Sequence, residues 1–90
     1  MPLMNNLTIR FATAADDLDR LAQLDSSVVP AAPQLVAEAD GRVIAALSTS
    51  DGQTIADPFT HSAEAVSLLR RRATQIDRPR RAHRLTLRLA

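Results

Sequence analysis

Two Asp-Gly pairs, at residues 40–41 and 51–52, constrain the fold more than any other feature of the chain. Each pair separates short apolar runs, and Asp-Gly in that setting is the strongest local indication of a β-hairpin. Three consecutive antiparallel strands are therefore predicted, at residues 35–39, 42–48 and 53–57. Pro58 is expected to end the third strand, because proline has no N–H to donate to a sheet.

A further strand and a first helix are predicted before this meander. Residues 7–11 alternate apolar and polar side chains, which is typical of a half-buried strand. Thr13 and Asp16 have the spacing of a capping box, so we expect a helix over about residues 14–26. The prolines at residues 30 and 33 indicate a loop between that helix and the hairpin.

A second helix is predicted over residues 61–75, with Thr60 or Ser62 as its cap. Its apolar positions follow helical spacing: Ala63, Val66, Leu69, Ala73 and Ile76. Phe59 is expected to pack onto this stripe and to anchor the helix. Pro79 is expected to end any helix. The residues that follow alternate again, so they predict either a short final strand or an unstructured basic tail.

The expected fold class is α+β, with an antiparallel sheet and two helices in β-α-β-β-β-α order. We divide the chain into a flexible segment (1–6), a domain (7–76) and an arginine-rich tail (77–90). A 90-residue chain with two aromatic residues builds a small core, which favours a homodimer. There is no cysteine, no signal-like start and no apolar run of membrane-spanning length, so we expect a cytoplasmic protein and consider a membrane partner unlikely.

The formal charge is divided between two parts of the chain. Residues 1–69 hold nine carboxylates and three arginines, a balance of −6, whereas residues 70–90 hold eight arginines and one aspartate, a balance of +7. The candidate site for a protein partner or a polyanion consists of these arginines: Arg70, Arg71, Arg72, Arg78, Arg80, Arg81, Arg84 and Arg88. Such a segment binds a polyanion, an anionic membrane or an acidic protein surface.

Residues 7–18 and 36–47 resemble the first strand, the helix entry and a central hairpin of the GNAT acetyltransferase superfamily. This resemblance covers about residues 7–57 and implies a truncated GNAT-like domain. The chain is also similar to small actinobacterial GNAT-like proteins with an Ala-Asp-Pro-Phe motif, here residues 56–59. In the family, a glycine-rich loop holds the acyl-CoA pyrophosphate. The corresponding segment, residues 57–64, has no glycine and two carboxylates, so we expect no cofactor.

Catalytic and metal-binding interpretations find little support in the residues. His61, Ser62 and Asp57 include the residue types of a triad, but their proximity in sequence does not make one. Glu38 matches a strand position where the family can place a general base, and alternation favours its solvent face. Two distant histidines have no metal-ligand spacing. No catalytic, cofactor-binding or metal residue is therefore assigned.

We expect a non-catalytic GNAT-like module that mediates self-association or binds a protein partner. One alternative is a divergent acyl-CoA-dependent N-acyltransferase completed by another chain. The other is a protein that binds RNA or a ribonucleoprotein particle through the arginine-rich tail. The sequence identifies neither a small-molecule ligand nor a substrate.

Overall fold

The computed structural model describes residues 7–89, with side chains described for residues 7–76. The segment expected to be flexible, residues 1–6, lies outside the described residues. The elements along the chain are β1 (Thr8–Phe11), α1 (Leu18–Leu24), β2 (Gln34–Ala39), β3 (Arg42–Ser48), β4 (Thr54–Ala56) and α2 (Ser62–Leu89). This arrangement confirms the α+β class and the predicted order of elements.

The strands form one antiparallel sheet in the order β1-β2-β3-β4. The β2–β3 hairpin turns through Asp40 and Gly41, whose φ angles are 52° and 80°. Both angles lie in the left-handed region that a two-residue type I′ turn requires, which is why an Asp-Gly pair favours this hairpin. A β-bulge shifts the register of β3, because Ile44 has no partner on β2.

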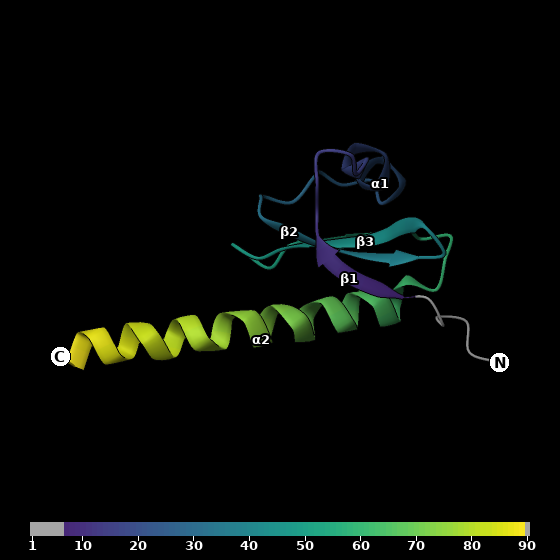
Figure 1. The fold of residues 1–90 in the computed structure, drawn as a ribbon. Coiled ribbons are helices and arrows are strands. Elements are labelled where there is room, and N and C mark those ends of the chain that lie inside the picture. The colour runs from purple at the N-terminus through teal and green to yellow at the C-terminus, as the bar shows by residue number, and fades with distance from the viewer. Residues whose placement is uncertain (1–6, 90) are drawn as a thin grey trace.

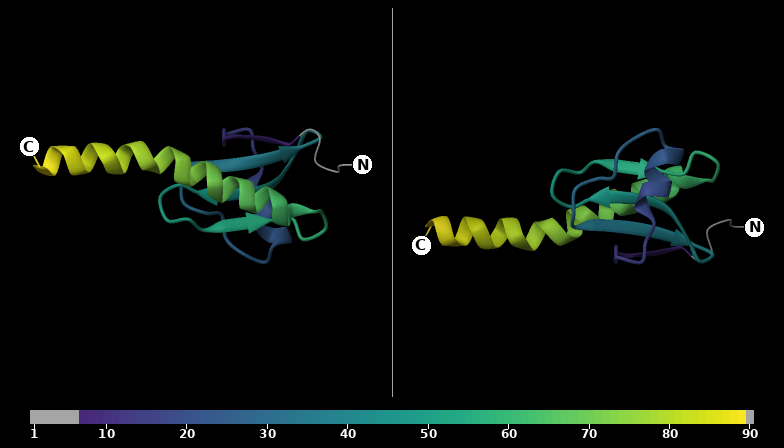
Figure 2. Two further views of the ribbon diagram at one scale, coloured as in Figure 1. Left: turned by 90° about the horizontal axis from the view of Figure 1, so that it is seen from below. Right: turned by 90° about the horizontal axis from the view of Figure 1, so that it is seen from above.

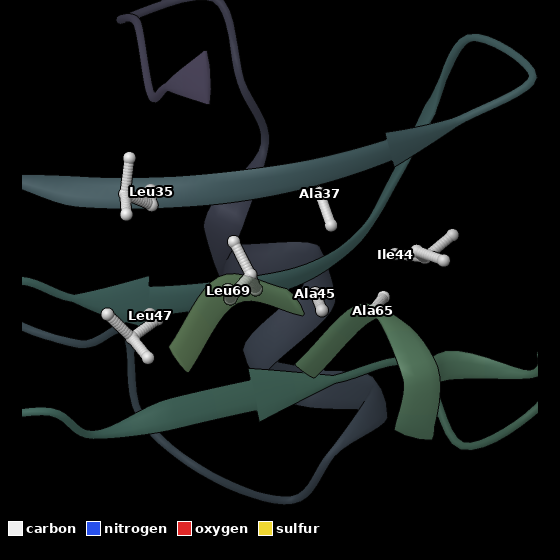
Figure 3. Packing of buried hydrophobic residues seen from close by; sticks show 7 residues of the cluster. All are labelled: Leu35, Ala37, Ile44, Ala45, Leu47, Ala65 and Leu69. Carbon is white, nitrogen blue, oxygen red and sulfur yellow. The ribbon is translucent and has the colours of Figure 1, made fainter. Parts of the chain in front are cut away.

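Both faces of the sheet are covered, one by α2 and the other by α1 (Figure 1). The cluster on the α2 side, shown in Figure 3, consists of Leu35, Ala37, Ile44, Ala45, Leu47, Ala65 and Leu69. The cluster on the α1 side consists of Leu18, Leu21, Ala22, Val36, Ala46 and Ile55. Neither cluster contains an aromatic ring, since Phe11 is 51% exposed and Phe59 is 81% exposed. The core is therefore entirely aliphatic.

The first helix is shorter than predicted and begins at Leu18, with Asp17 as its N-cap. Thr13 and Asp16 do interact, because the Thr13 amide donates to Asp16 Oδ2 at 2.7 Å and the Thr13 hydroxyl donates to the same oxygen at 3.3 Å. These bonds close a separate turn and not the first turn of the helix. The Asp16 carboxylate also accepts from Arg10 on β1, and this contact holds the turn against the sheet before α1 begins.

The second helix is longer than predicted and contains 28 residues, from Ser62 to Leu89. The expectation that Pro79 ends the helix is wrong, and residues 77–89 are helical where a strand or an unstructured tail was predicted. A proline inside a helix removes one hydrogen bond and costs about 3 kcal/mol. It lies here among arginine, alanine and leucine residues, which have high helix propensity, so the helix continues on both sides.

The predicted apolar stripe of α2 is confirmed for most of its members. Leu69 is fully buried, and Val66, Ala73 and Ile76 pack around the same cluster. Ala63 is exposed, and the core position belongs to Ala65. Residues 65, 69 and 73 are spaced by four, which places them on one side of the helix.

The C-terminal half of α2 extends beyond the end of the sheet, as Figures 1 and 2 show from three directions. Ile76, the last residue whose side chain is described, packs on the core. We call residues 77–89 the arm and the rest of the described chain the body. At 1.5 Å per residue, the 28-residue helix is about 42 Å long.

Candidate functional site

The arm and the last turns before it carry all eight arginines of the predicted site. Arg70, Arg71 and Arg72 are exposed on the part of α2 that lies over the sheet. Within residues 7–76 these three side chains make no ion pair, and Arg72 donates only to Gln75 Oε1 at 3.4 Å. The arm itself holds the five others: Arg78, Arg80, Arg81, Arg84 and Arg88. One helix thus places every predicted site residue along a length of about 27 Å.

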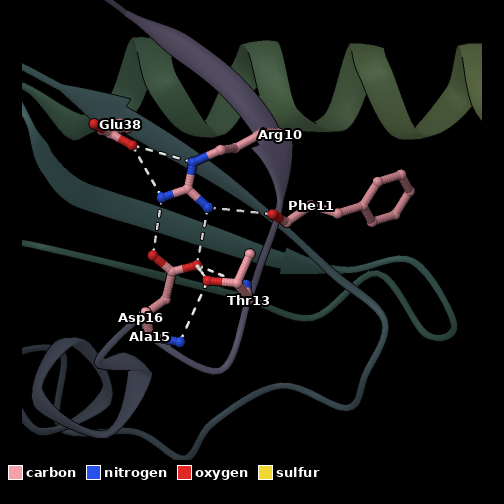
Figure 4. Close-up of polar contacts among 6 residues, drawn as sticks. All are labelled: Arg10, Phe11, Thr13, Ala15, Asp16 and Glu38. Carbon is pink, nitrogen blue, oxygen red and sulfur yellow. Dashed lines mark hydrogen bonds and ion pairs between the residues drawn. The ribbon is translucent and has the colours of Figure 1, made fainter.

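The described ion pairs of the body centre on Arg10 of β1 (Figure 4). Its guanidinium forms two 2.9 Å hydrogen bonds to the two oxygens of Asp16. It also donates twice to Glu38 Oε1, at 2.9 and 3.1 Å, and once to the Phe11 carbonyl at 3.2 Å. All five donors of the guanidinium are therefore used. The network joins β1, β2 and the turn before α1.

Electrostatics in this network favour the charged forms of Arg10 and Asp16. Hydrogen bonds from Arg10, supplemented by the Thr13 amide, hold the pKa of Asp16 far below its usual value. Hydrogen bonds to Asp16 and Glu38 raise the pKa of Arg10 well above that of a free arginine. Glu38 was predicted to lie on the solvent face, but its side chain is only 30% exposed. Its bound Oε1 serves Arg10, which disfavours a role as general base.

The network belongs to a face of the body that is rich in carboxylates. Asp17 and Asp25 cap the two ends of α1, and Asp19 is exposed in its first turn. Together with Asp16 and Glu38 they make five carboxylates against two guanidiniums, Arg10 and Arg20, a balance of −3. We call this α1 side of the body the acidic face. It lies on the opposite side of the sheet from α2 (Figure 1).

Asp57 organises the junction between β4 and α2. It is 3% exposed, and its Oδ1 accepts from the Phe59 amide at 2.8 Å. Its carbonyl accepts from the hydroxyls of Thr60 and Ser62 and from the Thr60 amide. Asp57 therefore accepts hydrogen bonds at this turn through both its side chain and its carbonyl. Thr60 and Ser62 were the predicted caps of α2. In the described bonds their hydroxyls donate to the Asp57 carbonyl, and neither accepts from an α2 amide.

The expected anchoring of α2 by Phe59 is wrong, because its ring is 81% exposed. The hydrogen bonds of Asp57, and not the Phe59 ring, hold this turn together, and the ring points outward. Four positions of this turn offer no free amide to a phosphate: Pro58 has none, and the amides of Phe59, Thr60 and Ser62 already donate within the turn. His61 is exposed and has no hydrogen bond within the described residues, so no serine–histidine relay is present there.

Sequence reasoning missed the Arg10 network and the depth at which Asp57 is buried. Alternation along β1 and β2 contains a signal for the network. Arg10 faces Val36 across the strand pair, and Glu38 lies two residues further along, on the same face. Among the described residues, no group of three or more histidine, aspartate or glutamate side chains is arranged to hold a metal ion.

No known family model, curated protein or solved structure matches this chain. In the described part of the chain, no helix combines the length and the apolar character needed to cross a membrane.

Proposed function

We propose that this chain is a non-catalytic, GNAT-like binding module whose arm binds an acidic protein surface. The observation that carries the proposal is the extension of α2 beyond the sheet with five arginines in thirteen residues. A helix that needed only to cover the sheet would end with the sheet, whereas Figures 1 and 2 show α2 running on past it. The arm therefore carries a dense positive charge away from the body. We also propose that the protein is cytoplasmic.

A protein partner fits the helix better than nucleic acid does. Residues 62–89 contain no phenylalanine, tyrosine or tryptophan on which a base can stack. The acidic face repels a phosphate backbone, which restricts any such contact to the arm. The arginine guanidinium pairs with carboxylates in a bidentate manner, so an acidic protein surface supplies suitable acceptors.

The acyltransferase alternative is disfavoured by the junction before α2. Its amides at residues 59, 60 and 62 donate to Asp57 and Thr60, so they are not available to a pyrophosphate. We expect isothermal titration with acetyl-CoA to release no binding heat. Saturable binding in the low micromolar range would restore the enzyme alternative.

Fluorescence anisotropy with labelled poly-L-glutamate and labelled single-stranded RNA tests the proposal. The intact chain is compared with the triple variant R78E/R81E/R84E, which keeps strong helix formers in the arm. We expect the intact chain to bind polyglutamate and the variant to lose at least about tenfold in affinity, because three guanidinium contacts become repulsive. Preference of the intact chain for RNA over polyglutamate at about 150 mM salt would replace the proposal with the nucleic-acid alternative.

A further inference from the structure

We propose that the partner of the arm is a second copy of this chain, with each arm lying on the acidic face of the other copy. This inference rests on the proposed function and identifies the surface that the arm binds. The arrangement has two-fold symmetry, so it closes as a dimer with two identical contacts. It requires that the arm cannot reach its own acidic face, that the charges match and that the lengths match.

The fold keeps the arm away from its own acidic face. The arm continues α2, and α2 and α1 pack on opposite faces of the sheet. Figures 1 and 2 show the arm running out past the end of the sheet on the α2 side. A continuous helix does not fold back without a break, and exposed charges separated by more than about 10 Å are largely screened at physiological salt. The acidic face is therefore left to a second molecule.

The charges on the two surfaces are complementary. The arm has five arginines and Asp77, a balance of +4, and the acidic face has a balance of −3. The acidic face already contains Arg10 and Arg20, but all five donors of Arg10 are used inside the body. Asp19 is exposed and has no ion pair within the described residues, so it offers a carboxylate to a neighbouring guanidinium.

The arm also has a length suited to this surface. Thirteen helical residues extend about 20 Å. The shortest dimension of the molecule is 20 Å, so one arm is about as long as that dimension of a second copy. Two such contacts per dimer double the buried area, and a small aliphatic core gains stability from association.

Sedimentation velocity with complementary charge reversals tests the dimer. The arm variant is R78E/R81E/R84E, and the face variant is D19R/Q23R, which leaves both capping aspartates of α1 in place. We expect the intact chain to sediment as a dimer, each variant alone as a monomer, and an equimolar mixture as a heterodimer. The matched control E64R/S67R adds the same charge at exposed α2 positions, and it should remain a dimer.

Circular dichroism of each variant establishes that loss of the dimer is not loss of folding, and the restored heterodimer gives the same information independently. An intact chain that remains a monomer but still binds polyglutamate would overturn this inference and leave the proposed function standing. A monomer that binds RNA and not polyglutamate would overturn both. Dissociation of the control together with the face variant would show that net charge, and not this face, governs association.

Discussion

Replacement of Arg10 by lysine is the sharpest test of the ion-pair network in the body. Lysine keeps the positive charge but replaces a planar fork of five donors with three donors on a point charge. The substitution therefore removes the paired contacts to both oxygens of Asp16 and the bond to the Phe11 carbonyl. The side chain of Asp16 is only 8% exposed, so its carboxylate finds little water as a substitute.

The expected loss is about 2 kcal/mol in the free energy of unfolding. A hydrogen bond to a charged group contributes about 1.5–3 kcal/mol when its partner is removed. The side chain of Arg10 is 35% exposed, and solvent screening reduces the total well below the sum of its bonds. For a domain of this size, about 2 kcal/mol lowers the melting temperature by about 8–16 °C. That loss is a large fraction of a total stability of roughly 5 kcal/mol.

The pH dependence of this loss has a definite sign. The folded state lowers the pKa of Asp16. The network therefore contributes its full stability at pH values above the pKa of an aspartate in the unfolded chain, which is about 4. The contribution disappears as the pH falls through the folded-state value, because a protonated carboxyl no longer attracts Arg10. The difference in stability between the parent and the lysine variant should therefore be constant near neutral pH and should narrow below about pH 4.

Thermal melts followed by circular dichroism at several pH values measure both quantities. The control is Arg42→Lys, the same chemical change at an exposed strand residue without a described ion pair, and it should melt within a degree or two of the parent. Equal melting temperatures for the two lysine variants would refute the argument. So would a difference that stays constant from neutral to strongly acidic pH.

Four further substitutions test the packing and the turns. Phe59→Ala should melt like the parent because the ring is 81% exposed, whereas Leu69→Ala should lose about 2–5 kcal/mol in thermal melts; a large loss for Phe59→Ala would show that the ring is buried. Asp57→Ala leaves the Phe59 amide without its acceptor and should lose about 1–3 kcal/mol, with faster hydrogen exchange at that amide; unchanged exchange would argue against the turn. Ser26→Gly should gain about 0.5–1 kcal/mol in urea unfolding, since Ser26 has a φ of 52°; a loss would contradict this conformation.

The strands and their order along the chain could be predicted because their signals are local. Asp40 and Gly41 supply two left-handed residues in succession, and that requirement is met by very few residue types. The resulting hairpin and the alternation of residues 7–11 determine most of the sheet. Helix ends were predicted less well. Asp16 binds Arg10 of β1 and lies in a separate turn, so α1 begins only at Leu18.

The body network and the position of Phe59 could not be predicted from local patterns. Arg10 binds partners that are 6 and 28 residues away, so the contact exists only once β1 and β2 are paired in register. Phe59 was expected inside because large apolar side chains favour burial. The side chain of Asp57, two residues earlier, is buried in its place. Its hydrogen bonds fix the turn in a conformation that leaves the Phe59 ring in solvent.

The predicted site shows most clearly what a sequence can and cannot reveal. Counting charges separates a negative body from a positive segment, but the count is the same whether that segment lies on the body or extends away from it. Pro79 suggested that the helix ends there, and in that case the arginines that follow could fold back onto the carboxylates of the same molecule. A helix that continues to Leu89 removes this freedom and keeps the two charges apart within one molecule. Opposite charges that cannot meet within one molecule favour binding between molecules, and for that reason the arm is the part of this protein where we place its function.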